Sequence, residues 1–413
     1  MKICFPRFVA TNALVLFTLL ALPAHGDVLD NWVSAQFSTN GFYFSDVAYG
    51  NNRYVAVGGS IYYDSGSDFG VICTSEDGQS WTVRHRPVFF VSTFPSKLNN
   101  VIYANGLYLA GGYTSTIYSS TNGLDWILRR SGSYGSWITG ITGGGPRFVA
   151  VGDGNSNSNI YSSTDGISWI AQKSLPSSLT NEAAPTSVAY GNGLYVAVGG
   201  KYAYTSSDGL TWNWFSYLGY NFTTVAFGNG IFIAPMGKGT NLVSKGSDPI
   251  LPVVPWTVLT NNTDTIFEKI RYGNGFFVAS GYSIAQNAHF LFTSTDGTNW
   301  VRPNFPHNNF QSVAFGDKRL ITVGNQVGPP GLTFTITTSL SEPFASVGIN
   351  HGNPPQISLS GLAGRSYRVE YLGDLQSTNW QTLSMLSLTN SPQMLTNTAA
   401  TNTSRFYRSV LLP

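Results

Sequence analysis

Apolar and polar residues alternate along the chain in short runs that are interrupted by tight, glycine-containing turns. Residues 188–200 read VAYGNGLYVAVGG, which is an apolar run, an Asn-Gly turn and a second apolar run. Similar phrases begin at Val47, Val101, Ile141, Val188, Val225, Ile270 and Val313. Asn-Gly between two such runs indicates a β-hairpin, because both turn positions tolerate positive φ. The pattern predicts seven hairpins, one for each phrase.

A second motif follows most of these hairpins and reads Ser-x-Asp-Gly-x-x-Trp. It occurs at residues 75–81, 163–169, 206–212 and 294–300, and residues 120–126 repeat it with asparagine in place of aspartate. Its defining residues are Asp77, Asn122, Asp165, Asp208 and Asp296, followed by Trp81, Trp126, Trp169, Trp212 and Trp300. We expect each Asp-Gly pair to form a hairpin turn with positive φ at both positions, in which the carboxylate accepts backbone N–H groups. One residue type at one place in every repeat indicates a structural role rather than catalysis or metal binding.

The tryptophans give the repeat length. Trp81, Trp126, Trp169, Trp212, Trp256 and Trp300 follow one another at intervals of 43 to 45 residues. This interval is typical of β-propeller blades, each built of four antiparallel strands. The last repeat lacks such a tryptophan, whereas Trp32 stands alone near the N-terminus. We therefore expect the strand at Trp32 to complete the last blade and close a seven-bladed β-propeller over residues 27–343, because closure removes exposed sheet edges.

The Ser-x-Asp-Gly-x-x-Trp segments resemble the Asp-box, the bacterial neuraminidase repeat, and are one residue shorter between aspartate and tryptophan. In that family the box lies on the outer hairpin of propeller blades, so the resemblance implies the same fold. It also implies a sialidase-like glycosidase as one possible activity. The Arg-Ile-Pro stretch of that family does not occur in this sequence.

The two ends of the chain differ from the repeats. Lys2 and Arg7 precede an apolar run at residues 13–22, and small residues follow it, as in a secretory signal peptide at residues 1–26. We expect an exported protein that begins near Asp27 and is secreted or held at the cell surface. The apolar run is too short to span a membrane. Residues 344–413 lack the repeat and predict a small C-terminal β-module that resembles a β-sandwich.

Charge and cysteine content narrow the function further. Charged residues make up 10% of the chain, and the mature chain would carry 20 basic and 20 acidic residues. This balance argues against nucleic acid as a partner. Cys73 is the single cysteine after residue 26, and we interpret it as a buried apolar residue. The sequence predicts no metal site and no cofactor, and we expect a monomer.

In an up-and-down blade the first and third turns lie on one face, and the second turn and the connection between blades lie on the other. The short, regular turns therefore share one face, and the irregular connections share the opposite face, where binding usually resides. Aromatic rings in these connections suit a sugar or another protein. The ligand-binding candidates are Phe89, Phe90, Trp137, Tyr217, Tyr220 and Phe310.

Candidate catalytic groups are few. A glycosidase needs two carboxyl groups facing one another across the scissile bond. Asp46 and Glu268 precede innermost strands and are candidates for the channel wall, and Arg271 stands where most repeats have alanine. The alternative is a structural salt bridge such as one between Glu268 and Arg271.

These patterns support three functions. The first is an exported, non-enzymatic protein that binds extracellular carbohydrate or protein through its variable loops. The second is a divergent glycoside hydrolase that uses channel carboxylates. The third is a structural surface protein anchored by its tail.

Overall fold

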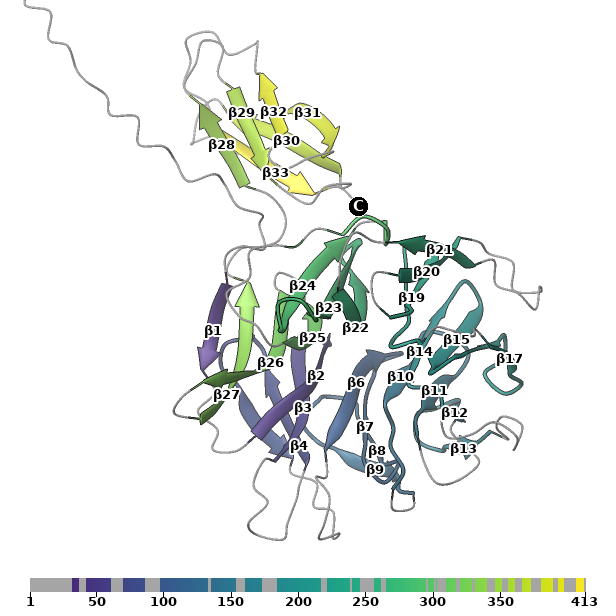
Figure 1. Ribbon diagram of the computed structural model, residues 1–413. Helices are drawn as coiled ribbons and strands as arrows, with labels where there is room; N and C mark the ends of the chain where they lie inside the picture. The colour runs from purple at the N-terminus through teal and green to yellow at the C-terminus, as the bar shows by residue number, and fades with distance from the viewer. Residues whose placement is uncertain are drawn as a thin grey trace, which may run out of the picture.

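The structure is a computed structural model of a chain made of β-strands (Figure 1). It describes residues 32–36, 42–60, 70–85, 97–132, 135–153, 160–172, 184–216, 221–237, 240–245, 256–260, 265–294, 296–300, 302, 310–316, 320–328, 331–339, 346–350, 356–360, 366–372, 380–388, 393–396 and 406–411. The predicted signal peptide lies outside these residues. Within them, no helix is long and apolar enough to cross a membrane.

The first three repeats each form a four-stranded antiparallel sheet in sequence order. They comprise β2 (Phe42–Gly50), β3 (Arg53–Ser60), β4 (Gly70–Ser75) and β5 (Thr82–His85); β6 (Leu98–Ala104), β7 (Leu107–Gly112), β8 (Ile117–Ser120) and β9 (Ile127–Arg130); and β10 (Gly140–Thr142), β11 (Phe148–Val151), β12 (Ile160–Ser163) and β13 (Ile170–Ala171).

The next repeats continue this plan. They comprise β14 (Ser187–Gly191), β15 (Leu194–Gly199), β16 (Tyr202–Ser206) and β17 (Asn213–Ser216); β18 (Ala226–Gly228), β19 (Ile231–Pro235), β20 (Thr240–Lys245) and β21 (Trp256–Thr260); and β22 (Thr265–Gly273), β23 (Phe276–Ser283) and β24 (Ala288–Ser294). The last of these sheets has three strands within the described residues.

The chain's first described strand completes the final sheet of the propeller. This sheet has the order β1-β27-β26-β25, built from β1 (Trp32–Gln36), β25 (Phe310–Phe315), β26 (Leu320–Gly328) and β27 (Gly331–Ser339). Trp32 is paired with Ser339, and Gln36 with Thr335. The predicted pairing of the Trp32 strand with the last repeat is therefore confirmed.

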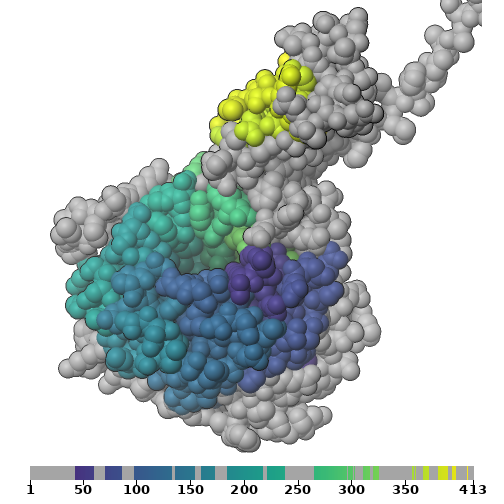
Figure 2. Space-filling view, turned by 180° about the vertical axis from the view of Figure 1, so that it is seen from behind, coloured from purple at the N-terminus to yellow at the C-terminus, as the bar shows by residue number. Residues whose placement is uncertain are grey.

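The innermost strands contact one another in a closed circle. β2 contacts β6, and the contacts continue through β10, β14, β18, β22 and β25 back to β2. Figure 2 shows the result from behind, where purple N-terminal residues lie against green residues of the later repeats. The fold is a β-propeller with four-stranded blades.

The two kinds of turn differ in backbone conformation. In the Asn-Gly turns both residues have positive φ, as at Asn192 (48°) and Gly193 (76°). In the box motif the glycine alone is left-handed: Gly166 has φ 70°, whereas Asp165 is not among the positive-φ residues. Our expectation of two positive φ values thus holds for the Asn-Gly turns and is wrong for the boxes.

Side-chain hydrogen bonds explain the box turn. Asp165 Oδ1 accepts the backbone N–H groups of Ile167 and Ser168, each at 2.8 Å, while Ser163 Oγ accepts the N–H of Gly166 at 2.8 Å. Asn122 Oδ1 accepts the N–H groups of Leu124 and Asp125 in the same way. The predicted acceptor role of this side chain is confirmed in all five copies. The carboxylates are occupied by their own turns.

Adjacent blades interlock through aromatic rings at the ends of innermost strands. A Cβ atom added to Gly50 would lie 2.0 Å from the ring of Tyr103 in the next blade, and Gly228 stands in the same relation to Tyr272. In the second blade, Ala104 takes the place of this glycine. The third blade has Gly143 where the other blades have the aromatic residue. A Cβ atom added to Gly143 would lie 2.6 Å from the Cβ atom of Ala104. The two exceptions to the repeat therefore compensate for each other.

Apolar clusters fill the space between neighbouring blades. One of them joins Val55 of the first blade to Val101 and Tyr108 of the second. Cys73 has no exposed surface and belongs to the cluster that joins the first and last blades, so its predicted burial is confirmed.

The tail contains two three-stranded sheets. Their orders are β28-β29-β32 and β31-β30-β33, from β28 (Ser346–Asn350), β29 (Gln356–Ser360), β30 (Ser366–Leu372), β31 (Gln381–Ser387), β32 (Gln393–Thr396) and β33 (Phe406–Leu411). Leu359, Tyr367, Val369 and Leu388 form one buried cluster. The boundary at residue 344 and a separate role for this part stay predictions.

Candidate functional site: central channel and connection face

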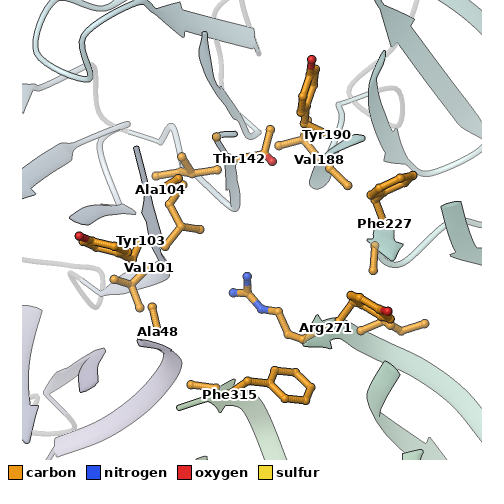
Figure 3. Close-up of a pocket in the computed structure, with 18 of the residues that line it drawn as sticks. Ala48, Val101, Tyr103, Ala104, Thr142, Val188, Tyr190, Phe227, Arg271 and Phe315 are labelled. Atoms are coloured by element: carbon orange, nitrogen blue, oxygen red, sulfur yellow. The ribbon is translucent and has the colours of Figure 1, made fainter. Parts of the chain in front are cut away.

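The innermost strands enclose a channel that contains two cavities. The larger has a volume of about 330 Å³ and lies where these strands end, beside the Asn-Gly turns. The smaller, of about 160 Å³, lies where they begin. Arg271 lines both cavities. Figure 3 shows its guanidinium group projecting into the centre of the larger cavity.

At the level of Arg271, most of the residues that line the channel are small. The equivalent positions in the other repeats are Ala48, Ile102, Thr142, Ala189, Ala226 and Ala314, and all of them line the larger cavity. Arg271 is therefore the one charged side chain at this level of the channel among the described residues.

Asp46 lies beside this channel and is fully buried. Its side chain has no exposed surface, and it pairs with Lys269 Nζ at 2.8 Å and with Arg271 Nη2 at 2.7 Å. Both cations come from β22, across the closure from Asp46 on β2.

The remaining contacts of Asp46 join three blades. Its Oδ2 accepts the side-chain amide of Asn100 at 2.7 Å and the N–H of Val101 at 2.9 Å, while its Oδ1 accepts the Ser312 hydroxyl. Asn100 links the second and third repeats in the same way, because its Oδ1 accepts the N–H of Ile141 at 3.0 Å. Asp46 is thus a structural link between the first, second, sixth and last repeats.

Asp46 and Lys269 are both charged at neutral pH. Burial acts to raise the pKa of Asp46, but Arg271, Lys269 and the hydrogen bond from Ser312 outweigh it and lower the pKa below its usual value. Burial lowers the pKa of Lys269 to about 8, against the opposing effect of Asp46. Two cations therefore surround one carboxylate.

Glu268 lies in a different environment. It occupies a β-bulge between Phe267 and Lys269, so Lys269 rather than Glu268 takes the position equivalent to Asp46. The Glu268 side chain is 44% exposed and lies 3.2 Å from His289 Nδ1. The suggested pair of Glu268 with Arg271 is corrected: Arg271 binds Asp46, and Glu268 faces His289.

This arrangement does not bring two available carboxylates together. Glu268 is the one acidic residue among those that line the described cavities, and Asp46 does not line them. Asp46 is also engaged by two cations and several hydrogen-bond donors. A glycosidase mechanism through these two carboxylates would require both to face a common substrate.

Trp137 lies on the connection face, at the seam between the second and third blades. Its ring is partly exposed and lies 4.5 Å from the ring of Tyr113, and Lys97 Nζ lies 6.0 Å from its centroid. Its backbone N–H donates to Asp153 O at 2.6 Å and holds the segment against the third blade. Burial lowers the pKa of Lys97. We call Lys97, Tyr113 and Trp137 the aromatic platform.

The turn beneath this platform is strained. Thr114 and Ser115 both have positive φ, 55° and 47°. A β-branched residue rarely adopts this conformation, and such strain often accompanies functional sites. The N–H of Ser115 donates to Ser136 O at 3.1 Å, and the N–H of Gly132 donates to Thr114 O. These bonds fix the turn to the connection that carries Trp137. The sequence alone did not single out this turn, because Thr-Ser carries no turn signal.

The other ligand-binding candidates divide into two groups. Phe310 is 3% exposed and packs in the core with Phe276, Leu291 and Leu320. It is therefore corrected from a ligand-binding candidate to a core residue. Phe89, Phe90, Tyr217 and Tyr220 lie outside the described residues.

Comparison with known proteins agrees with the fold. No family model matches the sequence, and no curated protein matches it. The structure resembles YCF48 bound to D1 peptide (18% identity, 76% of this chain and 97% of that chain, TM-score 0.52). It also resembles PorZ, a surface component of the type-IX secretion system of Porphyromonas gingivalis (12% identity, 89% of this chain and 59% of that chain, TM-score 0.56). The WD40 β-propeller domain of Doa1 aligns with a TM-score of 0.47 at 14% identity, over 74% of this chain and 95% of that chain.

At these identities the resemblance concerns the fold. This chain is a β-propeller protein, and it spans about three fifths of the length of PorZ.

Proposed function

We propose that this chain is an exported, seven-bladed, non-enzymatic binding propeller of the Asp-box type whose connection face recognises another extracellular protein. The observation that carries the proposal is the position of Trp137. It is partly exposed on the face where the irregular connections leave the blades, and Tyr113, Lys97 and Asp153 hold it in place. A rigid, partly exposed tryptophan is a frequent centre of protein interfaces.

The surroundings of Trp137 favour a protein over a carbohydrate. Sugar recognition requires polar groups directed at hydroxyls, but Thr114, Ser115 and Ser136 are buried beneath the platform. Backbone groups of Ser115 and Ser136 are hydrogen-bonded to each other. The structural neighbour YCF48 is bound to a peptide, which is consistent with a propeller that holds a protein segment. Carbohydrate recognition through the same ring is the alternative.

Binding is also favoured over hydrolysis. Asp46 is fully buried and neutralised, so it cannot act as a nucleophile or general acid without breaking contacts among four repeats. Glu268 then lacks the second carboxylate that the divergent glycoside hydrolase would need.

The proposal is tested with the mature chain, residues 27–413, on a peptide array and a glycan array in parallel. We expect peptide ligands whose affinity falls at least tenfold in Trp137→Ala. Trp214→Ala is the matched control, because Trp214 is 39% exposed on the outer strand β17, away from the platform. Binding to glycans alone would favour the carbohydrate alternative. Turnover of a glycoside that is lost in Glu268→Gln would contradict a non-enzymatic role.

A further inference from the structure

The larger channel cavity has an unbalanced positive charge. Asp46 carries one negative charge, and Lys269 and Arg271 each carry a positive one, so the cluster has a net charge of +1. Among the described residues, no acidic residue lines the larger cavity, and Glu268 lines the smaller one. The excess charge therefore faces the cavity through Arg271, whose side chain is 27% exposed.

Arg271 uses only part of its guanidinium group. Among the described residues, its hydrogen bonds leave from Nη2 alone, to the two carboxylate oxygens of Asp46 at 3.0 and 2.7 Å. Within the described residues, the Nε atom of Arg271 is buried and has no hydrogen-bond partner. Guanidinium groups bind planar carboxylates strongly, through directed and charge-assisted hydrogen bonds. The group projects into the cavity centre (Figure 3).

The cavity wall restricts the ligand further. Ala48, Ala189, Ala226 and Ala314 surround the arginine, and the volume of about 330 Å³ admits a small or slender molecule. A monoanion would neutralise the cluster, whereas a dianion such as sulfate would leave one negative charge without a counter-charge. The cavity volume and the charge together favour a slender molecule that ends in one carboxylate.

We propose that the larger cavity, on the Asn-Gly turn face, is a binding site for a slender monocarboxylate that pairs with Arg271. Such a carboxylate can belong to a small organic acid or to the end of a peptide chain. The site opens on the face opposite the aromatic platform. It therefore does not depend on the function proposed for Trp137, and either can fail without the other.

Calorimetric titration of the mature chain with hexanoate and with neutral hexanamide tests this site. We expect hexanoate to bind and hexanamide to bind at least tenfold more weakly. Acetyl-trialanine with a free carboxylate, titrated against its amidated form, distinguishes the two sources: tighter binding than hexanoate would indicate a peptide end. Equal binding of acid and amide, preference for sulfate, or no carboxylate binding at millimolar concentration would overturn the proposal.

Two sets of variants assign the binding to Arg271. Arg271→Gln should abolish hexanoate binding, but it also removes a partner of Asp46 and can affect folding. Thr142→Glu avoids this problem, because it leaves Arg271 intact and places a carboxylate on the opposite wall of the same cavity (Figure 3). We expect Thr142→Glu to abolish binding and the neutral Thr142→Gln to retain it, both with the melting temperature of the parent chain. Unchanged hexanoate binding in Thr142→Glu would contradict the assignment.

Discussion

At the scale of single residues, the same side-chain chemistry serves two different purposes in this protein. The box aspartates lie at the surface, exposed or, at Asp296, partly buried, and accept neighbouring backbone N–H groups, as Asp165 does from Ile167 and Ser168. Asp46 is buried and joins residues that lie as far as 266 positions away in sequence. The first kind is local and repeated, and the second occurs once and spans the closure of the propeller.

Asp46→Asn should lower the free energy of unfolding by about 2–3 kcal/mol, because it leaves two partly buried cations, Lys269 and Arg271, without their counter-charge. Denaturant unfolding at neutral pH measures this loss. Asp165→Asn is the matched control: it removes the same charge, but Asn122 shows that an amide makes the same turn, so we expect a change within about 0.5 kcal/mol. Similar losses in both variants would show that Asp46 has no special structural role.

Removing the acceptor altogether is a separate test of the box. Asp165→Ala should cost about 1 kcal/mol, because two backbone N–H groups lose their partner and turn to water instead. The same denaturation experiment measures this change. No loss in Asp165→Ala would mean that solvent replaces these hydrogen bonds without cost.

Acid should destabilise the protein below about pH 4. Burial acts to raise the pKa of Asp77, but the N–H groups of Ser80 and Gln79 outweigh it and lower the pKa to about 2. The pKa of Asp46 is lowered as well. A carboxylate with a lowered folded-state pKa stabilises above its unfolded pKa, and this stability disappears as the pH falls through the folded value. Unfolding free energies measured from pH 7 to pH 2 should therefore fall mainly between pH 4 and 2, and less steeply in Asp46→Asn. A flat profile over this range would contradict these pKa directions.

At the scale of elements, pairings between distant strands hold the propeller together. β1 pairs with β27 across almost the whole length of the propeller sequence. Bulges in β2, β6, β22 and β25 precede the polar residues Asp46, Asn100, Lys269 and Ser312, and turn them toward neighbouring blades.

Loss of β1 should destabilise the propeller far more than loss of the residues before it. A chain that begins at Asn31 retains β1, and one that begins at Gly41 lacks it and exposes the edge of β27. We expect calorimetry to show an unchanged melting temperature for the first and a clearly lower one for the second. Equal melting temperatures would mean that the β1–β27 pairing contributes nothing to closure.

Ala104 and Gly143, the exceptions to the packing of aromatic residues against glycines of adjacent blades, provide a test of that packing. Gly143→Tyr alone should cost about 1–3 kcal/mol, because Ala104 occupies the space that glycine leaves open in other repeats. Adding Ala104→Gly should recover part of this loss. The four chains form a double-mutant cycle in denaturant unfolding, and strictly additive effects would show that the two positions are independent.

At the scale of the whole molecule, the sequence repeat made the fold predictable. The closure of the blades into a ring made the contacts of the channel residues difficult to predict. The tryptophan interval and the missing seventh tryptophan were sufficient to predict the pairing of β1 with β27. The partner of Arg271 was not predictable, because Asp46 lies 225 positions away and is brought near only by closure. The bulge at Glu268 likewise shifts that residue out of register with Asp46.

The burial of individual aromatic residues could also not be predicted from the sequence. Phe310 begins an innermost strand and Trp137 lies just before one, yet Phe310 enters the core and Trp137 stays partly exposed. The difference arises because Phe310 is part of β25, whereas Trp137 belongs to the connection before β10 and pairs with Tyr113 through an isolated bridge.

The most direct test of the central claim is a hydrogen-exchange footprint of the mature chain with and without its peptide ligand. Recognition by the aromatic platform predicts protection at Lys97, Tyr113–Thr116 and Ser136–Thr139, which form the connection face beside Trp137. Strands β9 and β17 on the outer rim should exchange as in the free protein. Protection confined to the outer rim, with unchanged exchange around Trp137, would contradict the proposed mode of binding.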